Sequence, residues 1–116
     1  MTEHQLTDYL DHICAAIDRI LEYTSGLTQD EFAQDTRTQD AVIRNIEIIG
    51  EASNRIRTEY PAFAGAHPEL PLAAAYQMRN AVAHGYFEVD VGVVWKTVLN
   101  DVPRLRGMII DYVERK

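Results

Sequence analysis

Apolar residues recur every three or four positions through most of the 116-residue chain, which is the repeat of one buried face of an α-helix. No segment shows the sustained alternation of apolar and polar residues that a half-buried strand requires. Four long helical segments are expected, at about residues 2–23, 38–57, 72–83 and 90–115. They predict an all-α fold, an up-and-down bundle of four main helices in a single domain spanning residues 1–116.

The residues between these segments predict where the helices begin and end. Thr2 with Gln5, and Thr28 with Glu31, have the spacing of a capping box, in which each residue satisfies a free backbone N–H of the other. The first box should start the first helix, and the second should start a short extra helical turn. The segment 59–71 holds three prolines and is predicted to be a loop.

The second and fourth segments carry the clearest buried stripes. Gly50 lies in the middle of the second, at a cost of about 1 kcal/mol relative to alanine, so a close neighbouring helix is expected there. Asp90 should cap the fourth segment, and Pro103 should kink or restart it. The expected apolar positions are Val42, Ile46, Ile49 and Ile56 in the second, and Val91, Val94, Trp95, Val98, Leu99, Leu105, Ile109 and Tyr112 in the fourth.

Charge and cysteine content limit the classes of function. The net charge is −7, with 18 acidic and 11 basic residues, so the chain lacks the overall basic footprint of a non-specific nucleic-acid binder. Contact with RNA must therefore be local and built from a few arginines. No apolar run approaches the roughly 20 residues of a membrane helix, and no secretory signal is evident. With a single cysteine, Cys14, expected as a buried inert thiol, we predict a cytoplasmic protein with no membrane contact.

The segment MRNAVAHGYFEVD, residues 78–90, collects chemically active side chains at a predicted helix end, where Gly85 can let the chain turn. Asn80 and His84 are four residues apart and would share one helix face. Arg79 and His84 are five apart, about 140° around an ideal helix and ~7.5 Å along it, so they would not meet on a rigid helix. A loosened last turn, the long arginine side chain or a second subunit could bring both to one phosphate.

These residue types suit RNA cleavage without a metal. Histidine titrates near neutral pH and can accept the proton of a 2′-hydroxyl or donate one to the leaving 5′-oxygen. Arginine is permanently charged and can bind two phosphate oxygens, and Asn80 could orient His84 or donate to phosphate. The ordinary alternative is a helix end at which Arg79 and His84 bond carbonyls and a surface carboxylate.

Three stretches together resemble the HEPN superfamily, and within it the HepT-like toxins of HEPN–MNT toxin–antitoxin pairs. RNAVAHGYF (79–87) is similar to their R-x4-H-x-Y signature, AVIRNIEIIGEASNRI (41–56) to their second helix, and VDVGVVWKTVLNDVPRL (89–105) to their C-terminal segment. The resemblance covers nearly the full chain. One departure is Leu72, in a region where relatives often carry an aromatic residue near the start of the third helix.

The resemblance implies a four-helix bundle that forms a homodimer, with two motif helices lining a shared cleft. It implies a ribonuclease toxin in which Arg79 and His84 are catalytic and Asn80 supports them. It further implies that Tyr86 is adenylylated, as O-AMP-tyrosine, by a partner nucleotidyltransferase antitoxin. Tyr86 could instead pack into the bundle with its hydroxyl bonded to a carbonyl.

Other polar groups have a structural and a functional interpretation. Glu51 could point into the cleft and position an arginine, or form a helical ladder of ion pairs with Glu47 and Arg55. His4, Asp8 and His12 recur every four residues and could hold a metal ion, although a solvated helix stripe is the simpler interpretation. We expect no metal and no cofactor.

The leading hypothesis is a metal-independent endoribonuclease toxin that cleaves tRNA or mRNA, leaves a 2′,3′-cyclic phosphate and is neutralised by its nucleotidyltransferase. The alternative is a non-catalytic helical partner that regulates a minimal nucleotidyltransferase. A third possibility is nucleotide binding in the same cleft without cleavage.

Overall fold

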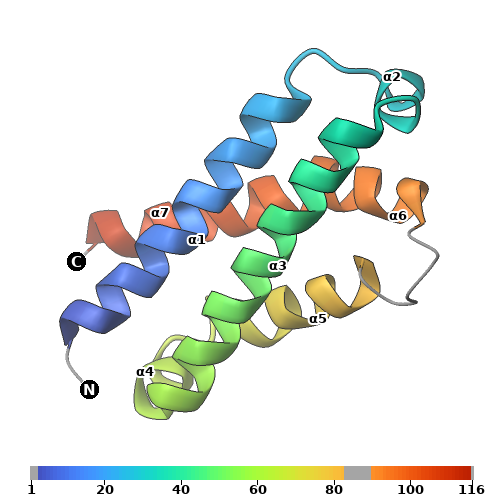
Figure 1. The fold of residues 1–116 in the computed structure, drawn as a ribbon. Coiled ribbons are helices and arrows are strands. Elements are labelled where there is room, and N and C mark those ends of the chain that lie inside the picture. The colour runs from blue at the N-terminus through green and yellow to red at the C-terminus, as the bar shows by residue number, and fades with distance from the viewer. Residues whose placement is uncertain (1–2, 83–89, 116) are drawn as a thin grey trace.

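The structure is a computed structural model that describes residues 3–82 and 90–115. Within these ranges the chain is helical and contains no strand, as predicted (Figure 1). The elements are α1 (Glu3–Thr24), α2 (Gln29–Ala33), α3 (Thr36–Glu59), α4 (Pro61–Ala66), α5 (Leu72–Val82), α6 (Val91–Lys96), the π-helical turn η1 (Thr97–Asp101) and α7 (Val102–Arg115). The last three are consecutive and form the fourth long arm of the bundle. None of the described helices has the length and apolar character needed to cross a membrane.

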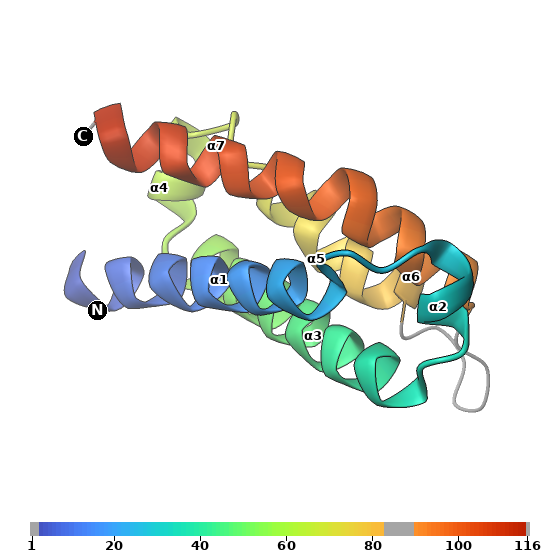
Figure 2. The ribbon, with the colours of Figure 1, turned by 90° about the horizontal axis from the view of Figure 1, so that it is seen from above.

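The long helices form two layers. Helices α1 and α3 lie side by side and run in opposite directions, and α5 and α7 cover one side of this pair (Figures 1 and 2). Helix α5 runs back along the C-terminal part of α3. The fully buried side chains between the layers include Ile13, Ile17, Ile20, Val42, Ile46, Ile49, Ile56, Val94, Val102 and Ile109. The four stripe positions predicted for α3 are all among the buried residues.

Local capping explains the corner between α1 and α3. Gly26 has φ +77°, a left-handed conformation that suits glycine and ends α1. The predicted capping box is present, since Thr28 N–H donates to the Glu31 carboxylate at 2.9 Å and Glu31 N–H donates to the Thr28 hydroxyl at 3.1 Å. The capping box stabilises the start of α2. Phe32 of α2 packs on Trp95 of α6, with ring centres 5.0 Å apart. The expected cap at Thr2 lies outside the described residues.

Three expectations about packing need correction. The segment 59–71 is not all loop, because Pro61 starts α4; proline at the first helical position loses no helical hydrogen bond. Cys14 is only partly buried, and burial followed by the nearby Asp18 and Asp11 raises the pKa of its thiol. Leu99 is 55% exposed instead of buried.

The π-helical turn η1 accounts for both Leu99 and Pro103. In a straight α-helix the ring of Pro103 would collide with the carbonyl of Leu99. The wider turn removes this conflict, and Val102 N–H bonds the carbonyl of Thr97 five residues back. Its extra residue rotates Leu99 out of the buried stripe. The predicted kink or restart at Pro103 is therefore this turn.

Candidate functional site

Arg79 lies near the C-terminal end of α5, where α5 packs closely on α3. Its partner on α3 is Gly50, and a Cβ atom added to Gly50 would lie 2.5 Å from the Cβ of Arg79 and 3.0 Å from its Cδ. Real Cβ atoms do not approach so closely, so the two helices can meet here only because residue 50 has no side chain. The close helix contact expected from the mid-helix glycine is thus confirmed, and it fixes the position of the Arg79 backbone.

The guanidinium of Arg79 lies over the ring of Tyr76, 5.9 Å from its centre, on the preceding turn of α5. A second arginine shares this ring: the guanidinium of Arg57, in the last turn of α3, is 5.5 Å from the same centre. Arg57 also donates to the side-chain carbonyl of Asn54 at 2.9 Å. Among the described residues, neither Arg57 nor Arg79 has a carboxylate within ion-pair distance. Both charges therefore remain without an anionic partner there.

Asn80 is exposed, and its side chain makes a long contact of 3.5 Å to Gln77. Within the described residues, no shorter side-chain hydrogen bond holds it at the end of α5. His84, Gly85 and Tyr86 lie outside the described residues, so the spacing of Arg79 and His84 in space, and the surroundings of Tyr86, stay predictions.

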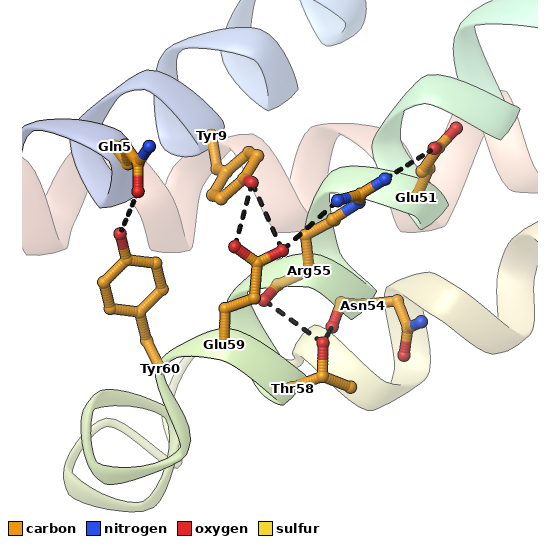
Figure 3. A network of polar contacts seen from close by, with 8 residues as sticks. All are labelled: Gln5, Tyr9, Glu51, Asn54, Arg55, Thr58, Glu59 and Tyr60. Atoms are coloured by element: carbon orange, nitrogen blue, oxygen red, sulfur yellow. Dashed lines mark hydrogen bonds and ion pairs between the residues drawn. The ribbon is translucent and has the colours of Figure 1, made fainter. Parts of the chain in front are cut away.

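Glu51 faces a different side of α3 from Gly50. Its side chain is 68% exposed, lies 3.9 Å from Arg55, and borders a hollow of about 260 Å³ with Tyr9, His12 and Ile48. Arg55 continues to Glu59 at 3.4 Å, and the hydroxyl of Tyr9 donates to the same carboxylate at 3.2 Å (Figure 3).

The predicted ion-pair ladder is therefore present as Glu51–Arg55–Glu59, one step further along the helix than expected. Exposed pairs of this kind add little stability, because solvent screens both charges. In this arrangement Glu51 engages Arg55, and its role as a positioning group for the Arg79 site remains a prediction.

The proposed metal stripe has little support. His12 is exposed at the hollow beside Glu51, while the side chain of His4 is not described. Among the side chains that are described, no group of three histidine, cysteine or acidic residues is arranged to hold a metal ion.

A larger groove lies on the layer formed by α5 and α7. It has a volume of about 440 Å³ and is lined mainly by apolar atoms of Ala74, Met78, Leu105 and Met108, with Arg104 among its polar residues. On α5, Ala73, Ala74 and Gln77 are exposed, so the outer surface of this helix is smooth and weakly polar.

Sequence reasoning missed Arg57 as a member of the Arg79 site. A signal was present: Gly50, Asn54 and Arg57 follow the spacing i, i+4, i+7 and so share one face of α3. Once Gly50 is recognised as the contact with α5, Arg57 must point to the same neighbour. The half-buried ring of Tyr76 joins the two arginines.

The fold and site together define an all-α bundle with an arginine near the end of a helix that pairs with no carboxylate of the described residues. The sequence model of the family described as "Ribonuclease HepT-like" matches residues 13–111. The chain belongs to this HepT-like ribonuclease family, which is part of the HEPN superfamily.

Similar proteins cover most of the chain. It is 47% identical over 100 residues to the "Probable ribonuclease HepT" of Thermococcus cleftensis, across 86% of this chain and 88% of that protein. A "Putative RNase" of Methanocaldococcus jannaschii is 32% identical over 103 residues, which are 89% of this chain and 83% of that protein. A longer protein of the same organism, named for a gamma-glutamylcyclotransferase and an RNase, is 40% identical over 91% of this chain but 46% of its own length. No solved structure matches the chain.

Proposed function

We propose that the protein is a metal-independent endoribonuclease, the toxin of a toxin–antitoxin pair, in which Arg79 and His84 act on the scissile phosphodiester of tRNA or mRNA. The observation that carries the proposal is the setting of Arg79. Its backbone is fixed against Gly50, its guanidinium lies over Tyr76, and no carboxylate pairs with it in the described part of the chain. The names of its relatives as ribonucleases, and the R-x4-H spacing, support the same conclusion.

The reaction needs a positive charge that binds the phosphate and a side chain that carries the proton. The 2′-hydroxyl oxygen attacks phosphorus while His84 accepts its proton. The bond from phosphorus to the 5′-oxygen then breaks as the protonated His84 gives that proton to the leaving oxygen. Negative charge gathers on the two other phosphate oxygens, which the planar guanidinium of Arg79 can bind together. Asn80 supports the site by donating to phosphate or orienting His84. The products are a 2′,3′-cyclic phosphate and a 5′-hydroxyl end.

A homodimer would complete the site. The smooth outer face of α5 and the apolar groove beside Met78 and Met108 are suited to burial against a second copy. We expect an interface of more than roughly 1,000 Å² that includes residues 72–84, and sedimentation should give a dimer at micromolar concentration. A protein that stays monomeric at tens of micromolar would contradict this arrangement.

Control of the toxin is assigned to Tyr86, two residues after His84. A nucleotidyltransferase antitoxin would transfer AMP from ATP to the Tyr86 hydroxyl oxygen, with release of pyrophosphate and loss of the hydroxyl proton. This would place a phosphate near Arg79, where it would compete with the phosphate of RNA. Co-expression with that enzyme should add AMP at Tyr86, located by mass spectrometry, and abolish cleavage. Inhibition that persists unchanged in Tyr86→Phe would show that the antitoxin acts by covering the site.

Cleavage of tRNA and mRNA in the presence of EDTA tests the activity itself. Arg79→Ala and His84→Ala should each lower the rate about 10²–10⁴-fold while the helical circular dichroism signal is retained. Arg44→Ala, which removes an exposed arginine elsewhere on α3, should leave the rate unchanged. A requirement for a metal ion or a 3′-hydroxyl product would refute the mechanism. Absence of cleavage together with tight binding of a nucleotidyltransferase would favour the non-catalytic partner.

A further inference from the structure

Arg57 is held in place by neutral groups. The amide of Asn54 accepts one of its N–H bonds at 2.9 Å, and the ring of Tyr76 lies under its guanidinium at 5.5 Å. Asn54 is one turn before Arg57, and Figure 3 shows its amide pointing away from the Glu51–Arg55–Glu59 ladder. An amide oxygen and an aromatic face orient a cation without cancelling its charge. Most of the five N–H donors of Arg57 therefore remain for a ligand.

Two other arginines of the bundle are paired with carboxylates. Arg55, two residues earlier, lies between the carboxylates of Glu51 and Glu59, and Arg106 pairs with Asp18 at 2.9 Å. Arg57 has no such pair within residues 3–82 and 90–115, although the whole chain carries seven more negative than positive charges. In an acidic protein, an ordered arginine that lacks a carboxylate is a place where an anion can bind.

Arg57 is also adjacent to the proposed catalytic arginine. Both guanidinium groups lie within 6 Å of the centre of the Tyr76 ring, so they form one small positive surface across α3 and α5. Arg79 is the only charged residue of α5, which has no acidic side chain to weaken this surface. The outer face of α1, in contrast, exposes Asp11, Asp18 and Glu22.

We infer that Arg57, positioned by Asn54 and Tyr76, binds a backbone phosphate of the RNA strand next to the phosphate bound by Arg79. This inference rests on the proposed ribonuclease function and adds the path of the RNA strand over the surface. The strand would run from the end of α5 across Tyr76 toward the C-terminal end of α3. A guanidinium contacts two oxygens of one phosphate, and neighbouring phosphates of a single strand can reach both arginines.

Binding of an uncleavable strand tests the inference separately from catalysis. The probe is a fluorescent 2′-O-methyl oligoribonucleotide, which lacks the attacking hydroxyl, and its anisotropy is followed over a series of salt concentrations. Arg57→Gln keeps a neutral N–H donor but removes the charge. Arg55→Gln is the matched control with the same change of net charge on the same helix. Arg57→Lys keeps the positive charge but lacks the planar guanidinium group.

Arg57→Gln should bind the probe roughly tenfold more weakly at low salt, and the slope of log K against log salt should fall by about 0.7, the value for one lost phosphate contact. Arg55→Gln should stay within about twofold of the parent protein. Arg57→Lys should recover the slope. In cleavage assays Arg57→Gln should raise KM while kcat changes little, which a purely structural defect would not produce. Thermal melting of each variant checks that it is folded.

Equal loss of binding in Arg57→Gln and Arg55→Gln would overturn the inference, because the effect would then be one of net charge. Cleavage by the parent protein with an unchanged KM in Arg57→Gln would overturn it too, while leaving the ribonuclease function intact. If the parent protein binds the probe through Arg57 but does not cleave RNA, the proposed function fails and the phosphate contact stands.

Discussion

The contact between Gly50 and Arg79 makes a sharp prediction for Gly50→Ala. In an exposed helix this substitution stabilises by about 1 kcal/mol, because alanine restricts the unfolded chain more than glycine does. At residue 50 the new methyl would lie 2.5 Å from the Cβ of Arg79. That atom moves only with the backbone of α5, so a change of side-chain rotamer cannot relieve the overlap.

The steric cost should exceed the gain. Carbon atoms pack at about 3.5–4.0 Å, so α5 must move away from α3 by roughly 1 Å. Inserting a methylene into a packed site costs about 1–3 kcal/mol, and the displaced helix also loses contacts of its buried Met78. We expect a net loss of about 1–2 kcal/mol. For a domain of this size that lowers Tm by about 4–8 °C. Displacement of Arg79 should also reduce RNA cleavage, by up to about 10²-fold.

Gly107→Ala is the matched control. Gly107 is exposed in α7, and a Cβ there meets no atom within 4 Å. This variant should gain up to about 1 kcal/mol and melt about 4 °C higher. Urea and thermal unfolding can be followed by the fluorescence of Trp95, the only tryptophan. If Gly50→Ala is stabilised as much as Gly107→Ala, the close approach of α3 and α5 is not as described.

Further predictions concern the helix ends and one buried hydroxyl. Thr28→Ala removes half of the capping box and should cost about 1 kcal/mol in urea unfolding; an unchanged midpoint would mean that the box does not stabilise α2. Ser53→Ala should be neutral or stabilising by up to about 1 kcal/mol, since its buried Oγ has no hydrogen-bond partner among the described residues, and a clear loss of stability would reveal one. Hydrogen bonds from the side chain and backbone of Thr38 lower the pKa of Asp35. The contribution of Asp35 to stability is therefore present above the unfolded pKa of about 3.9 and is lost as pH falls through the lower folded value. Asp35→Ala should destabilise the protein at pH 7 and have little effect at about pH 2. Equal effects at the two pH values would contradict this.

Much of the fold could be predicted because the decisive signals are local. The isoleucine stripe of α3 repeats with the period of a helix, and the capping box of Thr28 and Glu31 needs only neighbouring backbone groups. Gly50 predicted a closely packed neighbouring helix, because a glycine in the middle of a helix otherwise only lowers stability. The segment 59–71 was harder, because proline can either break a helix or start one, and the short α4 was not expected.

Tertiary contacts decided what local patterns left open. The π-helical turn before Pro103 depends on how the chain avoids the carbonyl of Leu99, so the exposure of Leu99 did not follow from its spacing. The motif residues Arg79 and Asn80 were evident in the sequence, because their types and spacing are a property of the chain. The partnership of Arg57 with Arg79 is a property of the packing. It arises where Gly50 lets α5 approach α3 and Tyr76 comes under both guanidinium groups. The spacing of Gly50 and Arg57 places them on one face of α3, but only the packing decides which helix and which ring meet that face.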